Sequence, residues 1–210
     1  MAEKRSDVVS ERPDTTVEGE RKRREVMDCA AELFARHGFD NTSINDIAHM
    51  ANLKKPSLYH YFPSKHSLLL AILTDGMAHL WADASQAAAI KDPVARLDAL
   101  LTSHLHNFGQ KLAHVAVFLL ERRVLERSEA DQAETRAYLE QRRAYDRLFA
   151  DAIRDGQKKG LFRQDDPVVL SYAILGMVNW MVQWYRVDGP LSLEEISGIL
   201  RRSALGALAK

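Results

Sequence analysis

The chain has 210 residues, with 29 Lys and Arg against 29 Asp and Glu, and 46% of its residues are hydrophobic. These values are typical of a globular protein and exclude whole-chain disorder, collagen and a continuous coiled coil. One cysteine excludes an internal disulfide and a Cys-rich zinc site. We expect no uncharged run of the roughly 18 residues that a membrane span needs, and the N-terminus lacks the apolar core of a signal peptide. The prediction is a cytoplasmic protein with no membrane partner.

Residues 1–20 are polar, acidic in balance and without a periodic apolar face, which predicts a disordered tail. The following block, 21–66, is mildly basic. Apolar residues recur there at helical spacing from Val26 to Phe34, and Gly38 follows as a helix stop. We therefore expect a first helix that begins near residue 21.

Two short helices are predicted next. Thr42 and Ser43 are candidate N-caps, and Ser43 with Asp46 has capping-box spacing, which favours a helix over about 43–51. The break at 52–54 is followed by Pro56 at the start of another short helix, and Ser64 then caps a long one. This order within 21–66 is the layout of a helix-turn-helix module, whose second short helix enters the DNA major groove.

The rest of the chain has helical periodicity throughout, with expected helices near 93–108, 115–126, 129–158, 166–184 and 192–208. The predicted fold is all-α with about nine helices. We expect a three-helix helix-turn-helix domain (21–66) on a helical bundle (67–210), which has enough apolar helix for a ligand pocket and a dimer interface.

Three stretches in the N-terminal block, 38–44 (GFDNTSI), 46–48 (DIA) and 57–65 (SLYHYFPSK), resemble the TetR-type repressor signature. The resemblance implies a ligand-responsive repressor that binds a palindromic double-stranded DNA operator as a dimer, and not an enzyme. It implies that Thr42 caps the second helix and touches a phosphate, and that Lys55 and Ser57 face the groove. It also implies a module core that includes Leu58 and Phe62. The expected DNA-contact residues are Thr42, Ser43, Lys54, Lys55, Ser57, Tyr59, His60, Tyr61 and Lys65, of which Tyr59, Tyr61 and Lys65 match phosphate-clamping positions.

A shorter stretch, from Trp180 to Leu193, is similar to the TetR-type branch that senses acyl-CoA thioesters of fatty-acid or steroid-ring degradation. A hydrophobic effector needs an aromatic, apolar pocket, and CoA phosphates need arginines at its mouth. Each arginine has an alternative interpretation, a surface ion pair with a neighbouring acid. The expected ligand contacts are Phe118, Arg122, Arg143, Tyr145, Arg147, Trp180, Trp184 and Tyr185.

The homodimer interface is expected in residues 166–208, where family members usually pair their last two helices in a four-helix bundle. The alternative is that these helices serve only the core of one chain. The expected apolar stripe consists of Leu170, Ile174, Met177, Met181, Ile196, Leu200, Ala204 and Leu205.

Two other functions stay open. One is a multidrug or small-aromatic sensor that represses an efflux pump, with acids instead of arginines at the pocket mouth. The other is a DNA-binding dimer without a ligand. Enzyme, metal and cofactor sites are not expected, because Cys29 lies among apolar residues of the first helix and His104, His106 and His114 lack zinc-motif spacing.

Overall fold

The computed structural model describes residues 16–110, 112–121, 124–125 and 132–210. Within them the chain is all-α, apart from an isolated bridge between Phe162 and Ala209. If α9 and α10 are taken as one interrupted helix, these residues carry the nine helices that were expected. The helices are α1 (Val17–His37), α2 (Ile44–Met50), α3 (Lys55–Tyr61), α4 (Lys65–Ala88), α5 (Pro93–Gln110), α6 (Leu112–Leu120), α8 (Gln132–Lys158), α9 (Pro167–Asn179), α10 (Met181–Trp184) and α11 (Leu193–Leu208).

The first helix begins earlier than the sequence indicated. Thr16 is its N-cap, and the Thr16 Oγ1 accepts the N–H of Gly19 at 3.1 Å. Glu18 and Glu20 lie in the first turn, where carboxylates interact favourably with the helix dipole. The prediction of a tail as far as residue 20 is therefore wrong for residues 16–20, whose polar composition reflects a solvated helix start. The rest of the predicted tail lies outside the described residues.

Local signals set the turns of the N-terminal module. Gly38 ends α1 with φ +80°, a backbone conformation that glycine adopts without strain. Asn52, in the turn between α2 and α3, has φ +55°, and asparagine is among the few other residues that tolerate this region. The N–H of Leu53 then donates to the carbonyl of Ala48 at 2.8 Å. These turns produce the predicted helix-turn-helix.

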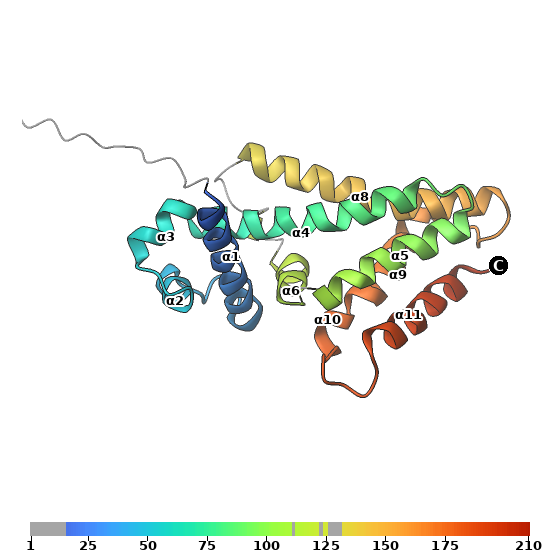
Figure 1. Cartoon of the computed structure of the whole chain (residues 1–210). Coiled ribbons are helices and arrows are strands. Elements are labelled where there is room, and N and C mark those ends of the chain that lie inside the picture. Colours follow the sequence, from blue (N-terminus) through green and yellow to red (C-terminus); the bar gives the residue numbers. More distant parts are fainter. Residues whose placement is uncertain (1–15, 111, 122–123, 126–131) are drawn as a thin grey trace, which may run out of the picture.

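Helix α4 joins the module to the bundle, and α2 and α3 lie at the end of the molecule away from α11 (Figure 1). In the bundle α4 packs against α5, α6 and α8, while α9 packs on α8 and α11 on α5. Helix α1 packs against both α4 and α6. A single hydrophobic core cluster runs from Val26 in α1 to Leu208 in α11, so the module and the bundle share one core.

The segment Pro167–Trp184 corrects one expectation. It is 18 residues long with mean hydropathy 1.2, and by length and composition alone it could cross a membrane. The expectation that no such run exists is wrong. In the structure 28% of this segment is buried within the single chain, because Ile174, Val178 and Met181 enter the core while much of its surface stays exposed.

Candidate functional site

Helix α3 presents polar and aromatic side chains at the free end of the module. Leu58 and Phe62 are buried in the core, as expected from the sequence, and α3 packs on α2. The opposite face carries the predicted DNA-contact residues of this helix. Lys54, Lys55, Tyr59 and His60 are exposed, and Ser57 and Tyr61 are half-buried.

The N-cap of α2 is Ser43, and not Thr42 as the resemblance implied. The Ser43 N–H and Oγ–H donate to Asp46 Oδ2 at 2.9 and 2.7 Å, and the Asp46 N–H donates to Ser43 Oγ at 3.2 Å. The hydrogen bonds from Ser43 lower the pKa of Asp46. Thr42 is 2% exposed, and its hydroxyl is directed inward, toward the carbonyls of Gly38 and Leu33. Thr42 therefore fixes the end of α1, and Ser43 is the exposed group of the pair.

Lys65, expected at a phosphate, is engaged within the chain. Its Nζ donates to the carbonyls of Phe39 and Thr42 at 2.7 and 2.8 Å and lies 4.2 Å from the centroid of the Phe39 ring. An ammonium group has three donors, and these contacts use two of them. Lys65 thereby holds the loop between α1 and α2 against the start of α4.

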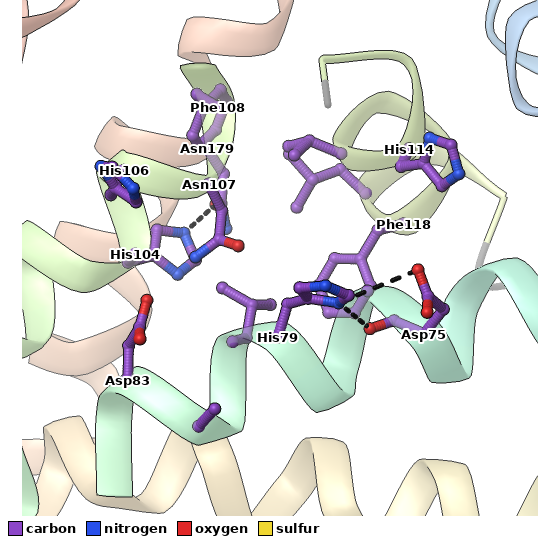
Figure 2. A pocket seen from close by; sticks show the side chains of 15 residues that line it. Asp75, His79, Asp83, His104, His106, Asn107, Phe108, His114, Phe118 and Asn179 are labelled. Atoms are coloured by element: carbon purple, nitrogen blue, oxygen red, sulfur yellow. Dashed lines mark hydrogen bonds and ion pairs between the residues drawn. The ribbon is translucent and has the colours of Figure 1, made fainter. Parts of the chain in front are cut away.

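A pocket of about 300 Å³ opens in the bundle between α4, α5, α6 and the end of α9 (Figure 2). This volume is at the lower end of the range for small-molecule sites. Apolar and polar groups share its wall, and its described lining contains no arginine or lysine. The lining consists of Asp75, Gly76, His79, Leu80, Ala82, Asp83, His104, His106, Asn107, Phe108, His114, Val115, Phe118, Leu119 and Asn179.

One side of the pocket is built on a buried hydrogen-bonded chain. His104 Nδ1 lies 2.9 Å from the Tyr145 hydroxyl, and His104 Nε2 lies 2.8 Å from Asn179 Oδ1. Burial lowers the pKa of His104 to about 4, so its imidazole is neutral at physiological pH. Burial also raises the pKa of Tyr145, which keeps the phenol protonated. His104 and Asn179 face the cavity across from Phe118 (Figure 2).

The expected ligand residues divide into three groups. Phe118 lines the pocket, and Tyr145 stands behind it through its contact with His104. Arg143 and Arg147 are exposed on α8 and do not line the pocket, because they lie on the solvent side of that helix. Arg122 lies outside the described residues. Arg142, which pairs with Asp146 at 3.3 Å, stacks on the Phe118 ring at 4.5 Å.

Trp180, Trp184 and Tyr185 do not line this pocket either. Trp180 is 63% exposed and Trp184 46% exposed, while Tyr185 is half-buried against the core. Trp184 instead borders a separate open groove with Leu191, Ile196, Ile199 and other residues between α10 and α11. The helix breaks at Trp180, which leaves both tryptophans exposed, so a contact of these aromatics with the effector stays a prediction.

Several pocket residues were missed by the sequence analysis. His79, Asn107 and Asn179 were not singled out, and His104, His106 and His114 were considered only as metal ligands. The sequence signal that could have identified these residues is the presence of polar side chains within apolar helices. Among the described residues no group of three His, Cys, Asp or Glu could hold a metal ion. Cys29 is half-buried against the core, and burial raises its pKa, which disfavours the reactive thiolate.

The apolar residues expected at the dimer interface are not the ones that this region exposes. Ile174, Met181, Ile196 and Ala204 belong to the core of the single chain and are at most 8% exposed, since each faces the helices beneath. The other four predicted residues are half-buried and pack against the core: Leu170, Met177, Leu200 and Leu205. The exposed large apolar side chains of this region are Val168, Val169, Tyr172, Trp180, Trp184, Val187, Leu191 and Ile199.

Helix α6 connects the pocket to the N-terminal module. His114 lines the pocket, and its Nε2 lies 3.2 Å from Oδ1 of Asp28 in α1. Just beyond the end of α6, Glu121 Oε1 accepts the N–H of Phe39 at 3.1 Å, next to the turn that Lys65 holds. A ligand that displaces α6 would therefore act on α1 and on the loop before α2.

Comparisons with known proteins agree with this architecture. Residues 26–72 match the model described as bacterial regulatory proteins, tetR family, and residues 91–208 match the tetracyclin repressor-like C-terminal domain. The HTH-type transcriptional repressor KstR2 of Mycolicibacterium smegmatis is 30% identical over 201 residues, which cover 94% of this chain and 96% of the relative. The structure of the ketosteroid regulator KstR2 of Mycobacterium tuberculosis has a TM-score of 0.80 at 26% identity, with 90% and 95% coverage. AibR in complex with isovaleryl coenzyme A and operator DNA has a TM-score of 0.76 at 27% identity, with 87% and 97% coverage.

Proposed function

This chain belongs to the TetR family of bacterial transcriptional repressors, and we propose that it is a homodimer released from its operator by an acyl-CoA thioester. The observation that carries the proposal is a pocket linked by α6 to the DNA-binding module. Its partners are then a palindromic DNA operator, the effector and a second copy of the chain, all in the cytoplasm.

The proposed DNA surface is the exposed side of α3. Lys55, Ser57 and His60 have donors suited to base edges, while Tyr59 and Tyr61 have hydroxyls suited to phosphates. Lys54 and the exposed Ser43 lie at the starts of α3 and α2, where phosphate contacts fix the register. Few base-reading side chains imply that DNA shape contributes to recognition. Affinity for the operator should fall steeply with salt as counterions are released from neutralised phosphates.

We place the interface of the proposed dimer on α9, α10 and α11. Support comes from the exposed apolar side chains there, among them Tyr172, Trp180 and Ile199, since an extended apolar surface marks a contact site. Two-fold symmetry then presents two α3 helices to half-sites about one DNA turn, roughly 34–36 Å, or a multiple of it apart.

The effector assignment rests on the pocket and on the relatives. A cavity of about 300 Å³ has room for an acyl or ring group, and the CoA nucleotide would extend outside it. AibR has been crystallised with isovaleryl coenzyme A and operator DNA, and KstR2 of Mycobacterium tuberculosis is a ketosteroid transcriptional regulator. Within this proposal Phe118 contacts the acyl group, and Tyr145 acts through His104. For Arg122, Arg143 and Arg147 we keep a contact with the external CoA phosphates as an expectation.

Release requires that the effector bind the DNA-incompetent dimer better than the competent one. The route we propose is a shift of α6 that alters the contacts of His114 with Asp28 and of Glu121 with Phe39. Because α1 packs on both α6 and α4, that shift changes the separation of the two α3 helices. A coupling of about 1–3 kcal/mol would lower operator affinity roughly 5–150-fold.

One observation favours a second candidate function, a sensor of cationic or aromatic small molecules. The described pocket lining contains Asp75 and Asp83 and no arginine or lysine, which suits a cationic or planar aromatic ligand. Such a ligand would make the protein a sensor that represses an efflux pump.

The deciding experiment titrates ligands into the full-length protein bound to DNA that it has selected from a random library. The series consists of CoA thioesters of increasing acyl length, the matching free acids, CoA itself and dye-like cations. Release by the thioesters alone supports the proposal. Release by cations alone supports the drug sensor. Release by none of them indicates a dimer without a ligand among these classes, and release by free acids alone refutes the CoA requirement while leaving the repressor intact.

A further inference from the structure

Asn179 occupies an unusual position in the pocket wall. It is the last residue of α9 and the single contribution of that helix to the described lining. Its Oδ1 lies 2.8 Å from Nε2 of His104. Among the described residues, no protein atom accepts a hydrogen bond from its Nδ2 group. The Asn179 Nδ2 group is therefore available to a ligand in the pocket, while the Oδ1 of the same amide contacts His104.

The orientation follows from the chemistry of the chain behind it. An amide oxygen only accepts, so the 2.8 Å contact with Asn179 Oδ1 requires a proton on His104 Nε2. A neutral imidazole carries one N–H, which leaves Nδ1 with a lone pair. The Tyr145 hydroxyl at 2.9 Å must then donate to Nδ1. With Asn179 Oδ1 toward the ring, Tyr145 therefore donates to His104, and His104 donates to Asn179.

We infer that Asn179 is the specificity-determining hydrogen-bond donor of the pocket, and that the effector must present a carbonyl oxygen to its Nδ2 amide. His104 and Tyr145 are positioning residues, which hold the amide with its N–H groups toward the ligand. The inference rests on the proposed function in that it takes this pocket as the effector site. It adds that a thioester or ketone oxygen next to an apolar group is what the pocket recognises.

The neutral state of His104 supports this assignment. Burial of the ring at 5% exposure favours the uncharged imidazole. Arg142 opposes a positive charge on the ring, while Asp146 and the Asn179 hydrogen bond favour it; burial outweighs both. If His104 were charged, both nitrogens would donate, and Tyr145 would have to accept instead.

The second pocket amide gives a matched control. The Nδ2 of Asn107 donates to the carbonyl of Ser103 at 2.9 Å, so its orientation is set by its own helix and not by His104. Asn107→Asp and Asn179→Asp make the same chemical change in the same pocket wall. Only the second removes the proposed donor, while it keeps an oxygen for His104 Nε2.

The first measurement uses the free, full-length protein. The ¹⁵N NMR signals of the His104 ring, assigned by comparison with His104→Gln, should show a proton on Nε2 and a lone pair on Nδ1. Tyr145→Phe should shift the Nδ1 signal, because the donated O–H is lost. A proton on Nδ1 in the wild-type protein would turn the amide oxygen of Asn179 toward the pocket and overturn the inference.

The second measurement compares ligand pairs that differ only in the carbonyl. The pairs are butyryl-CoA with S-butyl-CoA, and cyclohexanone with methylenecyclohexane, each titrated by calorimetry or NMR. The carbonyl member should bind at least about tenfold more tightly, the effect of leaving one buried donor unpaired. Asn179→Asp and Asn179→Leu should abolish that preference, and Asn107→Asp should keep it.

The outcomes separate the two proposals. A preference confined to the ketone pair, with no binding of either CoA compound, would refute the CoA effector and leave the inference on Asn179 standing. No preference for the carbonyl member in either pair, including no binding, would overturn the inference. An equal loss of preference in Asn107→Asp and Asn179→Asp would also overturn it.

Discussion

The N-terminal module and the ligand pocket use their polar side chains in different ways. In the module, Ser43 bonds to Asp46 and Thr42 to Gly38, partners three or four residues apart. In the pocket, His104 joins Tyr145 and Asn179, which are 41 and 75 residues away. The start of α2 and the end of α1 are therefore fixed by local hydrogen bonds, to which Lys65 adds longer-range contacts with Phe39 and Thr42, whereas the hydrogen-bonded chain of the pocket forms only when α5, α8 and α9 have packed together. We expect substitutions to affect the two regions differently, and the following predictions test that difference from the largest effect to the smallest.

The largest effect should come from Leu58→Ala. Leu58 is fully buried in the core, so truncation should cost about 2–5 kcal/mol of folding free energy. Operator binding should be lost while the pocket still binds its ligand, which denaturant unfolding and calorimetry would measure. His60→Ala, an exposed change on the same helix, is the control and should leave stability within about 0.5 kcal/mol. Simultaneous loss of ligand binding in Leu58→Ala would show that the two regions are not separable.

The pocket should respond to pH through His104. Its pKa is lowered from 6.5 to about 4, so the unfolded chain binds more protons between these values, and stability must fall as the pH drops from 6.5 to 4. The full effect is about 3 kcal/mol. Urea unfolding at several pH values should give a shallower slope for His104→Gln, because glutamine does not titrate. Equal slopes in the two proteins would contradict the buried neutral state.

Lys65→Met should show that this residue stabilises the module. The change removes two charged hydrogen bonds to the carbonyls of Phe39 and Thr42, worth about 1–2 kcal/mol for a half-exposed group. Lys55→Ala, with an exposed side chain on α3, should leave the melting temperature unchanged and alter only the preferred DNA sequence. If Lys65→Met weakened DNA binding with no change in thermal stability, Lys65 would be a phosphate contact as the resemblance implied.

The link between the regions should depend on Glu121. In Glu121→Ala the N–H of Phe39 loses its acceptor, so the effector should bind as before but release the operator less completely, by about fivefold. Such a loss corresponds to about 1 kcal/mol of coupling. Operator release measured at saturating ligand would detect it. Glu140→Ala, an exposed change on α8, is the control and should release normally.

The smallest expected effect compares two equivalent caps. Ser43 and Ser192 each form a capping box, one at α2 in the module and one at α11 in the bundle. Their replacement by alanine should cost about 1 kcal/mol in each case. We expect only Ser43→Ala to weaken operator binding, measured by fluorescence anisotropy. Equal weakening by Ser192→Ala would argue against a direct DNA role for Ser43.

The same difference explains which features of the fold and the site could be predicted from the sequence. The caps at Ser43 and Ser64 and the break at 52–54 could be predicted, because each depends on neighbours within a few residues. The chain from Tyr145 to Asn179 was not visible, because it depends on which faces of three helices meet. The positions of Trp180 and Trp184 could not be predicted for the same reason. Helical periodicity identifies apolar residues, but it does not distinguish a pocket wall from an exposed surface.

The outward position of Trp180 and Trp184 has a spectroscopic consequence. The chain has three tryptophans, and Trp180 and Trp184 are 63% and 46% exposed in the single chain, while Trp81 is half-buried on α4. Indole emission shifts to the blue when water leaves the ring. If these two rings are covered by a second copy, dilution of the unlabelled protein should move its emission to the red. The molecule would then report its own association through intrinsic fluorescence.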